Sequence, residues 1–247
     1  MRKNFFSFVG LTMFLLLTMM DASFAAPFKF PNKIHYDIFV NGSNEASSTF
    51  SFVSKKDKAG TPVYQLSFGN FQALGFTSRD KIYTVIFQKD LSLSRTVLTR
   101  GKEKIYEMKA KKGSGMFDDE AITFVYTEDT LTGPIETEPY TPHRVIDLLS
   151  LFMVASESVA NGNKGTQNFS FFVKKSTEVV ELIPLDKAEV SYQGAEVSTT
   201  VMELSHQGRE ILKLNIYRDK NGFHFPVQLS IKDNAEGLVE FRATKAY

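Results

Sequence analysis

Hydrophobic and polar residues alternate around residue 35, the pattern of a strand with one buried face. The residues of one face are Ile34, Tyr36, Ile38 and Val40, and those of the other are His35, Asp37 and Phe39. Asn41-Gly42 follows, and both residues tolerate the positive φ angles of a tight hairpin turn. The pattern predicts a β-strand that turns back at residue 41.

Runs of the same kind continue along the chain, with turn-forming residues between them. The first series of expected strands is Thr49–Ser54, Val63–Phe68, Lys81–Gln88, Leu91–Thr99, Lys104–Ala110 and Ala121–Tyr126. The second series is Asn168–Lys174, Thr177–Ile183, Lys187–Tyr192, Ala195–Leu204, Ile211–Tyr217, Phe223–Ile231 and Leu238–Ala243. Short, evenly spaced strands with tight turns indicate an antiparallel meander rather than βαβ units.

One helix is expected between the two series. Glycine and proline break the strand pattern over residues 131–141, so we expect a connecting loop there. The helix is expected over Pro142–Ala160, because Thr141 can cap it and proline suits the first helical position. Asn161-Gly162-Asn163 is a typical helix stop.

The expected helix is apolar around most of its circumference. Its polar residues His143, Asp147, Ser150 and Glu157 form one narrow stripe, and apolar residues cover the other roughly 200°. A strongly curved sheet that wraps around the helix would bury such a surface, whereas a helix lying on a flat sheet would expose several of these side chains. We therefore expect a mainly β fold, an antiparallel strongly curved sheet or open barrel-like meanders, with one central helix near 142–160.

The first 25 residues have the layout of a secretory signal peptide. Arg2 and Lys3 precede an apolar run over Val9–Met20, and Ser23-Phe24-Ala25 places small residues at the two positions that signal peptidase reads. The apolar run is shorter than the roughly 20 residues of a membrane span, which favours cleavage after Ala25 over an uncleaved anchor. The expected location is the periplasm of a Gram-negative cell.

The mature chain, residues 26–247, is expected to form a single β-rich domain. The alternative is two lobes, 26–130 and 142–247, joined by the loop 131–141. No run of 18 or more apolar residues follows the signal peptide, so no membrane span is expected after cleavage.

Composition narrows the chemistry further. The signal peptide contains Arg2, Lys3 and Asp21, which leaves the mature chain with a net charge of zero. A neutral chain lacks the basic excess that binding to nucleic acid requires, so nucleic acid is not an expected partner. The chain has no cysteine, which excludes disulfides, thiolate metal sites and cysteine nucleophiles.

Three residues of the expected helix have the side chains of a hydrolytic triad: His143, Asp147 and Ser150. In a triad the histidine lies between the serine and the carboxylate. Here the aspartate is in the middle, and His143 and Ser150 are about 10 Å apart along a helix axis. We interpret these residues as a polar stripe. No catalytic residue is expected, and the chain is not expected to be an enzyme.

Metal and cofactor sites are not expected either. The histidines His35, His143, His206 and His224 are scattered, without the spacing of a metal site. Asp118-Asp119-Glu120 lacks the loop spacing of a calcium site.

A lysine-rich segment leaves two interpretations open. The segment over 100–112 is basic and precedes an acidic stretch over 116–142, so the two can attract each other or simply be solvated. Alternatively, five lysines contact an anionic component of the envelope: Lys102, Lys104, Lys109, Lys111 and Lys112.

Phenylalanine is abundant in the expected strands, and tryptophan is absent. Most of these rings belong in a core, but a curved sheet with such an interior can also hold an apolar ligand. The residues expected to line this apolar interior are Phe68, Phe87, Phe152, Met153, Phe171 and Phe225.

Three motifs in the second half carry a resemblance to a known family. They are Asp147-Leu148-Leu149-Ser150-Leu151-Phe152; Leu214-Asn215-Ile216-Tyr217 with the turn Asp219-Lys220-Asn221-Gly222; and Phe225-Pro226-Val227 with Gly237 and Leu238–Ala243. Over roughly 142–243 the chain resembles an uncharacterised family of exported bacterial β-rich proteins that carry a domain of unknown function. Members often have a tryptophan in the late strand, where this chain has Ile216-Tyr217. The resemblance implies an exported β-rich protein and carries over no site residue.

The expected function is that of a non-catalytic binding or accessory protein of the Gram-negative periplasm, which holds a hydrophobic small molecule or a lipid. The alternative is a structural or interaction module that docks on another envelope protein through an exposed strand edge.

Overall fold

The computed structural model of the chain describes residues 29–56, 62–69, 81–88, 93–100, 103–112, 122–128, 135–136, 145–173, 176–233 and 237–247. The expected signal peptide and its cleavage site lie outside these residues. Along this part of the chain, no helix combines the length and the hydrophobicity that crossing a membrane requires.

The described residues form fifteen strands and the helix α2 (Leu148–Ala160). The strands before the helix are β1 (Lys33–Val40), β2 (Ser43–Lys56), β3 (Pro62–Gly69), β4 (Lys81–Gln88), β5 (Leu93–Arg100), β6 (Glu103–Lys112), β7 (Ile122–Glu128), β8 (Ile135–Glu136) and β9 (Val145–Ile146). Those after it are β10 (Gln167–Val173), β11 (Ser176–Tyr192), β12 (Ala195–His206), β13 (Arg209–Arg218), β14 (His224–Asp233) and β15 (Gly237–Ala246).

All these strands belong to one sheet, in the order β8-β7-β6-β5-β4-β3-β2-β1-β15-β14-β13-β12-β11-β10-β9. Each pair is antiparallel except β9 with β10, which is parallel. The first described strand, β1, pairs with the last, β15, so these two strands meet in the middle of the sheet. The sheet is therefore continuous across the two expected lobes, and the division into one domain or two lobes stays a prediction.

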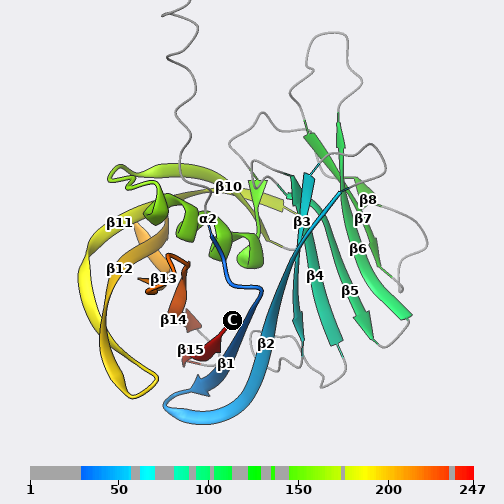
Figure 1. Cartoon of the computed structure of the whole chain (residues 1–247). Coiled ribbons are helices and arrows are strands. Elements are labelled where there is room, and N and C mark those ends of the chain that lie inside the picture. Colours follow the sequence, from blue (N-terminus) through cyan, green and yellow to red (C-terminus); the bar gives the residue numbers. More distant parts are fainter. Residues whose placement is uncertain are drawn as a thin grey trace, which may run out of the picture.

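The sheet is strongly curved. Figure 1 shows β10–β15 curling around α2, while β3–β8 extend to the other side as a flatter wing. The tip of the β11–β12 hairpin bends far enough for the Gln193 side-chain amide to donate a hydrogen bond of 3.3 Å to the backbone oxygen of Thr244 on β15. The expected fold class, a curved antiparallel sheet with one central helix, is confirmed.

The first predicted hairpin is also confirmed. Ile34, Tyr36 and Ile38 of β1 are buried, as the alternation predicts. Asn41 and Gly42 have φ angles of 50° and 86°, the conformation of a tight two-residue turn.

The expected start of the helix is wrong. Val145 and Ile146 form β9, which pairs with Ser170 and Phe171 of β10, and the helix begins only at Leu148. Its N-cap is Asp147, whose carboxylate accepts a hydrogen bond of 2.8 Å from the backbone N–H of Ser150. The Ser150 hydroxyl in turn bonds the backbone N–H of Asp147 at 2.8 Å, which completes a capping box. Thr141 and Pro142 lie outside the described residues.

The expected end of the helix is confirmed. Gly162 has a φ of 68°, and its N–H bonds the carbonyl of Val159 at 3.0 Å. The N–H of Asn163 bonds the carbonyl of Ser158 at 3.0 Å, so the last turn closes as a Schellman motif.

Two strand boundaries differ from expectation. The segments Thr177–Ile183 and Lys187–Tyr192 form one strand, β11, whose register shifts between Pro184 and Lys187. A bulge absorbs the extra residue and bends the strand without ending it. The expected loop over 131–141 also contains β8, which pairs with Val125 and Tyr126 of β7.

The helix is buried on nearly every side, which excludes the alternative of a helix on a flat sheet. Its side chains from Leu149 to Ser156 are all buried. The ring of Phe152 lies 4.6 Å from that of Phe50 and 6.2 Å from that of Tyr36, measured between centroids. The Tyr36 hydroxyl donates a 2.6 Å hydrogen bond to the carbonyl of Pro226, and burial, followed by the nearby Tyr192, raises the pKa of this phenol well above its ordinary value.

The capped end of the helix contacts the other half of the sheet. The buried hydroxyl of Thr96, on β5, donates a hydrogen bond of 3.3 Å to the carboxylate of Asp147. Asp147 thus fixes the start of α2 and links it to the flatter wing.

Replacement of Phe152 by alanine should lower the free energy of unfolding by about 3–5 kcal/mol, because the surrounding rings cannot fill the cavity. Urea unfolding of the mature chain measures the loss. Val179→Ala is the control, because Val179 is 54% exposed and its truncation should cost less than about 0.5 kcal/mol. An equally small loss of unfolding free energy in both variants would contradict the central position of Phe152.

Replacement of Asp147 by alanine should destabilise the protein by about 1–2 kcal/mol, because the first turn of α2 loses its cap. Asp147→Asn keeps a side-chain oxygen that caps equally well, so it should retain most of the stability. The same unfolding measurement compares the two. If Asp147→Asn were as unstable as Asp147→Ala, the negative charge rather than the cap would be the important property.

Candidate functional site

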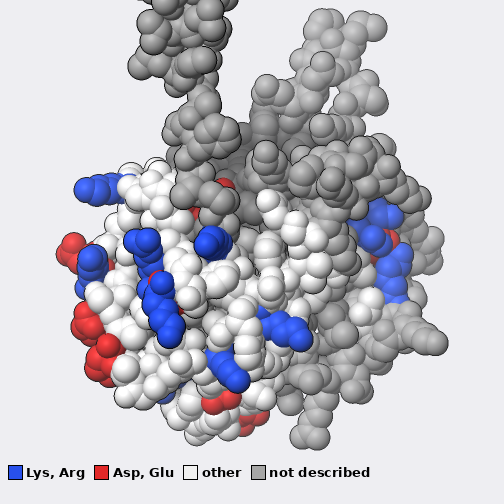
Figure 2. Space-filling view, viewed as in Figure 1, with Lys and Arg blue, Asp and Glu red and all other residues white. Residues whose placement is uncertain are grey.

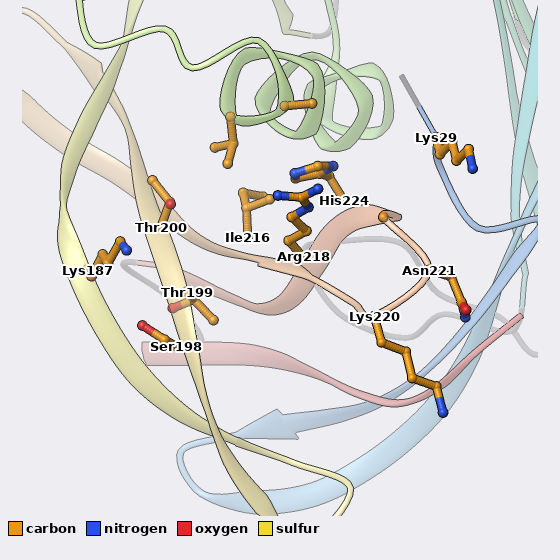
Figure 3. A pocket seen from close by; sticks show the side chains of 13 residues that line it. Lys29, Lys187, Ser198, Thr199, Thr200, Ile216, Arg218, Lys220, Asn221 and His224 are labelled. Carbon is orange, nitrogen blue, oxygen red and sulfur yellow. The ribbon is translucent and has the colours of Figure 1, made fainter. Parts of the chain in front are cut away.

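A hollow of about 680 Å³ lies at the C-terminal end of α2. Its walls come from Val159 and Ala160 of the helix, from β11 and β12, from the turn between β13 and β14, and from Lys29. Figure 3 shows Arg218 and His224 next to each other beneath α2, with Lys187 and Thr200 facing them across the hollow.

The strand register explains why these side chains meet. Lys187 pairs with Thr200, and Thr200 pairs with Ile216. Arg218, two residues after Ile216, pairs with His224. Directly paired residues, and residues two apart on a strand, point to the same face of a sheet. The five side chains therefore share one face of β11–β14, with Arg218 and His224 one row beyond Lys187, Thr200 and Ile216, and the bulge after Pro184 brings Lys187 onto that face.

The hollow is strongly basic. Among the described residues that line it, four carry a positive charge and none is acidic; the four are Lys29, Lys187, Arg218 and Lys220. The carbonyl end of a helix carries roughly −0.5 of an elementary charge, and α2 has no basic residue of its own in the last turn. The helix end therefore offsets only a small part of the positive charge.

Three acids stand close to this group in the sequence. Asp186 and Glu189, beside Lys187 on β11, are exposed and do not line the hollow. Asp219 stands between Arg218 and Lys220, and its carboxylate is engaged in the turn. Its Oδ1 accepts hydrogen bonds of 2.8 Å from the backbone N–H groups of Asn221 and Phe223. This arrangement, with Gly222 at a φ of 81°, confirms the predicted turn over 219–222. Asp219 thus shapes the rim of the hollow.

His224 has an unusual environment. Its Nδ1 atom is buried and has no hydrogen-bond partner among the described residues, and its backbone N–H donates to the carbonyl of Lys29 at 3.0 Å. Burial lowers the pKa of the imidazole, and the positive charge of Arg218 lowers it further, while a hydrogen bond to the backbone of Gly222 and the charge of Asp219 offset part of the shift. Arg218 and Lys187 are exposed, whereas the ring of His224 is half-buried in the wall.

The chemistry available is the binding of negative charge. Ammonium and guanidinium groups face the same space as the hydroxyls of Ser198 and Thr200, and Val159 and Ile216 add apolar surface. Among the residues that the structure describes, no three histidines or acids gather where they could hold a metal ion.

Figure 2 shows basic side chains spread over the visible face of the curled part of the sheet, with acidic side chains mostly toward its edge. Elsewhere on β12 and β13, Lys213 pairs with Glu210 at 2.6 Å and with Glu203 at 3.8 Å. Opposite charges are thus neighbours there, unlike in the hollow.

The residues expected to form an apolar interior fall into three groups. Phe152, Met153 and Phe225 are each 1% exposed and are enclosed by other core side chains. Phe171 is half-buried and packs against that core. The side chains of Phe68 and Phe87 lie outside the described residues. A hydrophobic ligand among these residues stays a prediction.

The other candidates from the sequence are spread over the fold. Asp147 and Ser150 cap α2, while His143 and Asp118-Asp119-Glu120 lie outside the described residues. His35 bonds the Thr49 hydroxyl at 2.8 Å, and His206 lies 2.9 Å from the carbonyl of Val179. The described chain does not bring these histidines together.

Two of the five lysines in the basic segment have described side chains, and both bind one acid. Glu107 of β6 is buried, and its carboxylate lies 2.5 Å from Lys104, 3.2 Å from Lys109 and 2.5 Å from Arg95. Burial alone would raise the pKa of Glu107, but hydrogen bonds from these three cations lower it to about 2. The segment thus contains its own counter-charge.

Sequence reasoning missed the hollow, although one signal was present. In β13 the buried residues Leu212, Leu214 and Ile216 alternate strictly, and Arg218 stands at the next position of the same face. A cation that continues an apolar series predicts a polar end to the core.

No family model matches this chain. No curated protein matches it either. Among solved structures, the chain is similar to the β-barrel-like protein of domain of unknown function DUF1849 from Brucella abortus, with a TM-score of 0.50 and 12% sequence identity. The match covers 89% of this chain and 99% of the other. It shows that the two chains share a fold, in agreement with the resemblance to an uncharacterised β-rich family.

Replacement of Glu107 by glutamine should destabilise the protein at neutral pH by roughly 1–2 kcal/mol, a modest loss because water screens its half-exposed partners. A lowered pKa in the folded state stabilises above the unfolded value of 4.5, and this contribution is lost as the pH falls toward about 2. Urea unfolding at pH 7, 4.5 and 2.5 should therefore show a difference in unfolding free energy between wild type and Glu107→Gln that becomes smaller as the pH falls.

The control is Glu189→Gln, which removes the same charge from an exposed position on β11. A constant difference between wild type and Glu107→Gln at all three pH values would contradict the ion-pair assignment.

Proposed function

We propose that this chain is an exported, non-catalytic binding protein of the Gram-negative periplasm, and that it holds an anionic, lipid-like ligand with its charged group in the basic hollow. The observation that carries the proposal is the set of four cations around one hollow whose described lining contains no acid. The location rests on the signal-peptide pattern of residues 1–25.

Charge supports an anionic ligand. Lys187 and Arg218 lie on neighbouring parts of one sheet face, where like charges repel each other unless a counter-charge is present. A bound anion would remove that repulsion and gain charge-assisted hydrogen bonds.

Size and lining support a ligand larger than a simple ion. The hollow of about 680 Å³ falls within the range of roughly 300–1,000 Å³ that small-molecule pockets usually have. Val159, Ala160 and Ile216 offer apolar contact beside the charged groups. An amphiphile with an acidic head matches both kinds of surface.

A binding role is favoured over catalysis by the kind of groups present. A hydroxyl nucleophile needs an adjacent base, and the base needs a third group to orient it. His224, the histidine in the described wall, lies beside Arg218, and burial followed by the charge of Arg218 lowers the pKa of the imidazole. Such a site suits an anion better than proton transfer from serine.

A docking module is the second candidate, and one observation favours it. β9 pairs only with Ser170 and Phe171 of the seven-residue strand β10. Beyond these two residues no further strand pair continues along this edge among the described residues, and a partner strand could add there.

The mature chain should bind laurate and dodecyl phosphate, below their micelle concentrations, at least about ten-fold more tightly than dodecyltrimethylammonium, which has the same tail and the opposite charge. The double variant Lys187→Glu/Arg218→Glu should lose about ten-fold or more in affinity for both anions. Isothermal titration calorimetry measures the affinities.

The matched control is Lys33→Glu/Lys245→Glu, which changes the net charge equally at exposed residues that do not line the hollow. Equal losses in the two double variants, or equal binding of the cationic and anionic amphiphiles, would reject the hollow as the ligand site. Recovery of the chain from native envelopes in a stoichiometric complex, with no bound amphiphile, would favour the docking module.

A further inference from the structure

We propose that the hollow recognises a phosphate monoester, and that Arg218, Lys187 and His224 contact its oxygens. This inference rests on the proposed function, because it names the anionic group of the same ligand. It covers a phosphorylated lipid head group and a soluble phosphate ester alike, since both present the same chemistry.

The unpartnered nitrogen of His224 is the first observation. Buried side-chain nitrogen and oxygen atoms are nearly always hydrogen-bonded, and a buried one without a partner is costly. Nδ1 of His224 is such an atom, on a residue that lines the hollow. A phosphate dianion offers only acceptors, and the His224 ring already bonds the backbone of Gly222, so Nδ1 would donate from the imidazolium form, in which both nitrogens carry a proton. The charge of the bound dianion favours that form.

The position of Arg218 is the second observation. It pairs directly with His224 across β13 and β14, and Figure 3 shows both side chains beneath the end of α2. A guanidinium presents N–H donors in a planar fork that fits two oxygens of a phosphate at once. Arg218 and His224 together therefore form a donor surface on one side of the hollow.

Lys187 closes the site from the opposite side. It stands on β11, in register with Thr200, whose hydroxyl lies in the same lining. A phosphate monoester has three terminal oxygens that point in different directions, so donors from several sides can bind it together. A carboxylate has two oxygens in one plane and would leave part of this donor set unused.

The amount of charge also favours phosphate. A phosphate monoester carries about −1.5 to −2 at pH 7, whereas a carboxylate or a sulfate monoester carries −1. The described lining holds four cations, while Asp219 at the rim is held by hydrogen bonds from its own turn. The more highly charged anion therefore gains more electrostatic free energy when it binds among these cations.

The experiment compares three ligands with the same tail and different heads: dodecyl phosphate, dodecyl sulfate and laurate, below their micelle concentrations, on the mature chain at pH 7.5. Calorimetry should show that dodecyl phosphate binds at least about ten-fold more tightly than the other two. Phosphorus NMR should show a shifted resonance for the bound ester.

Two variants test the named contacts. Arg218→Lys keeps the charge and removes the planar fork of N–H donors. It should therefore lower the affinity for dodecyl phosphate by about ten-fold, while the affinity for laurate changes much less. His224→Ala should also lower the affinity for dodecyl phosphate more than the affinity for laurate. His206→Ala is the control, because His206 bonds Val179 on β11 and does not line the hollow. Because Arg218 is exposed, its variant tests the inference even if His224→Ala folds poorly.

Glycerol 3-phosphate, which has no tail, distinguishes the two sources of the phosphate. Much tighter binding of dodecyl phosphate than of glycerol 3-phosphate would assign a lipid head group. Similar affinities would support the phosphate site while rejecting the lipid-like ligand of the proposed function.

Failure of the inference is distinct from failure of the proposed function. If all three amphiphiles bind in the hollow with equal affinity, or if Arg218→Lys weakens all three alike, the phosphate inference is overturned and the anionic site stands. If none of them binds, both are overturned.

Discussion

The structure depends on enclosing a helix that is apolar on almost every side. A flat sheet can cover one face of α2, but its side chains from Leu149 to Ser156 are all buried. The sheet satisfies this requirement by curling, and the pairing of β1 with β15 joins strands from the two ends of the described chain around the helix. The Tyr36 ring contacts that of Phe152, and its hydroxyl donates a hydrogen bond to the carbonyl of Pro226. The curvature is thus a consequence of the helix sequence.

The hollow follows from a mismatch in length. A helix of thirteen residues is about 20 Å long, whereas the seventeen residues of β11 extend for roughly 55 Å. Gly162 ends the helix with a Schellman turn, but the strands that surround it continue. Beyond Val159 and Ala160 no turn of α2 remains to fill the curve, and this is where the hollow lies. The feature that ends the helix therefore also positions the candidate site.

The sequence predicts the parts of this fold that depend on local patterns. The alternation of polar and apolar residues identifies β1, and Asn41-Gly42 identifies the turn that follows it. The wide apolar surface of α2 predicts the curvature of the sheet. The helix start was misplaced because Thr141-Pro142 is a good local signal, whereas pairing of Ile146 with Phe171 is a long-range contact. The group of side chains that lines the hollow was missed for a similar reason. It depends on a register set by a bulge after Pro184, which periodicity alone does not reveal.

The protein has two basic clusters, and only one of them contains an acid that neutralises its positive charge. Around Glu107, three cations share one buried carboxylate, so the chain neutralises them itself. In the hollow, Lys187 and Arg218 lie on the sheet face that continues from Ile216 and Met202, where apolar residues would simply have extended the core. The described lining provides no acid, and the nearby Asp219 is hydrogen-bonded within its own turn. Lys187 and Arg218 remain exposed to water, so they cost the fold little, and the positive charge of the hollow is left available to a negatively charged partner.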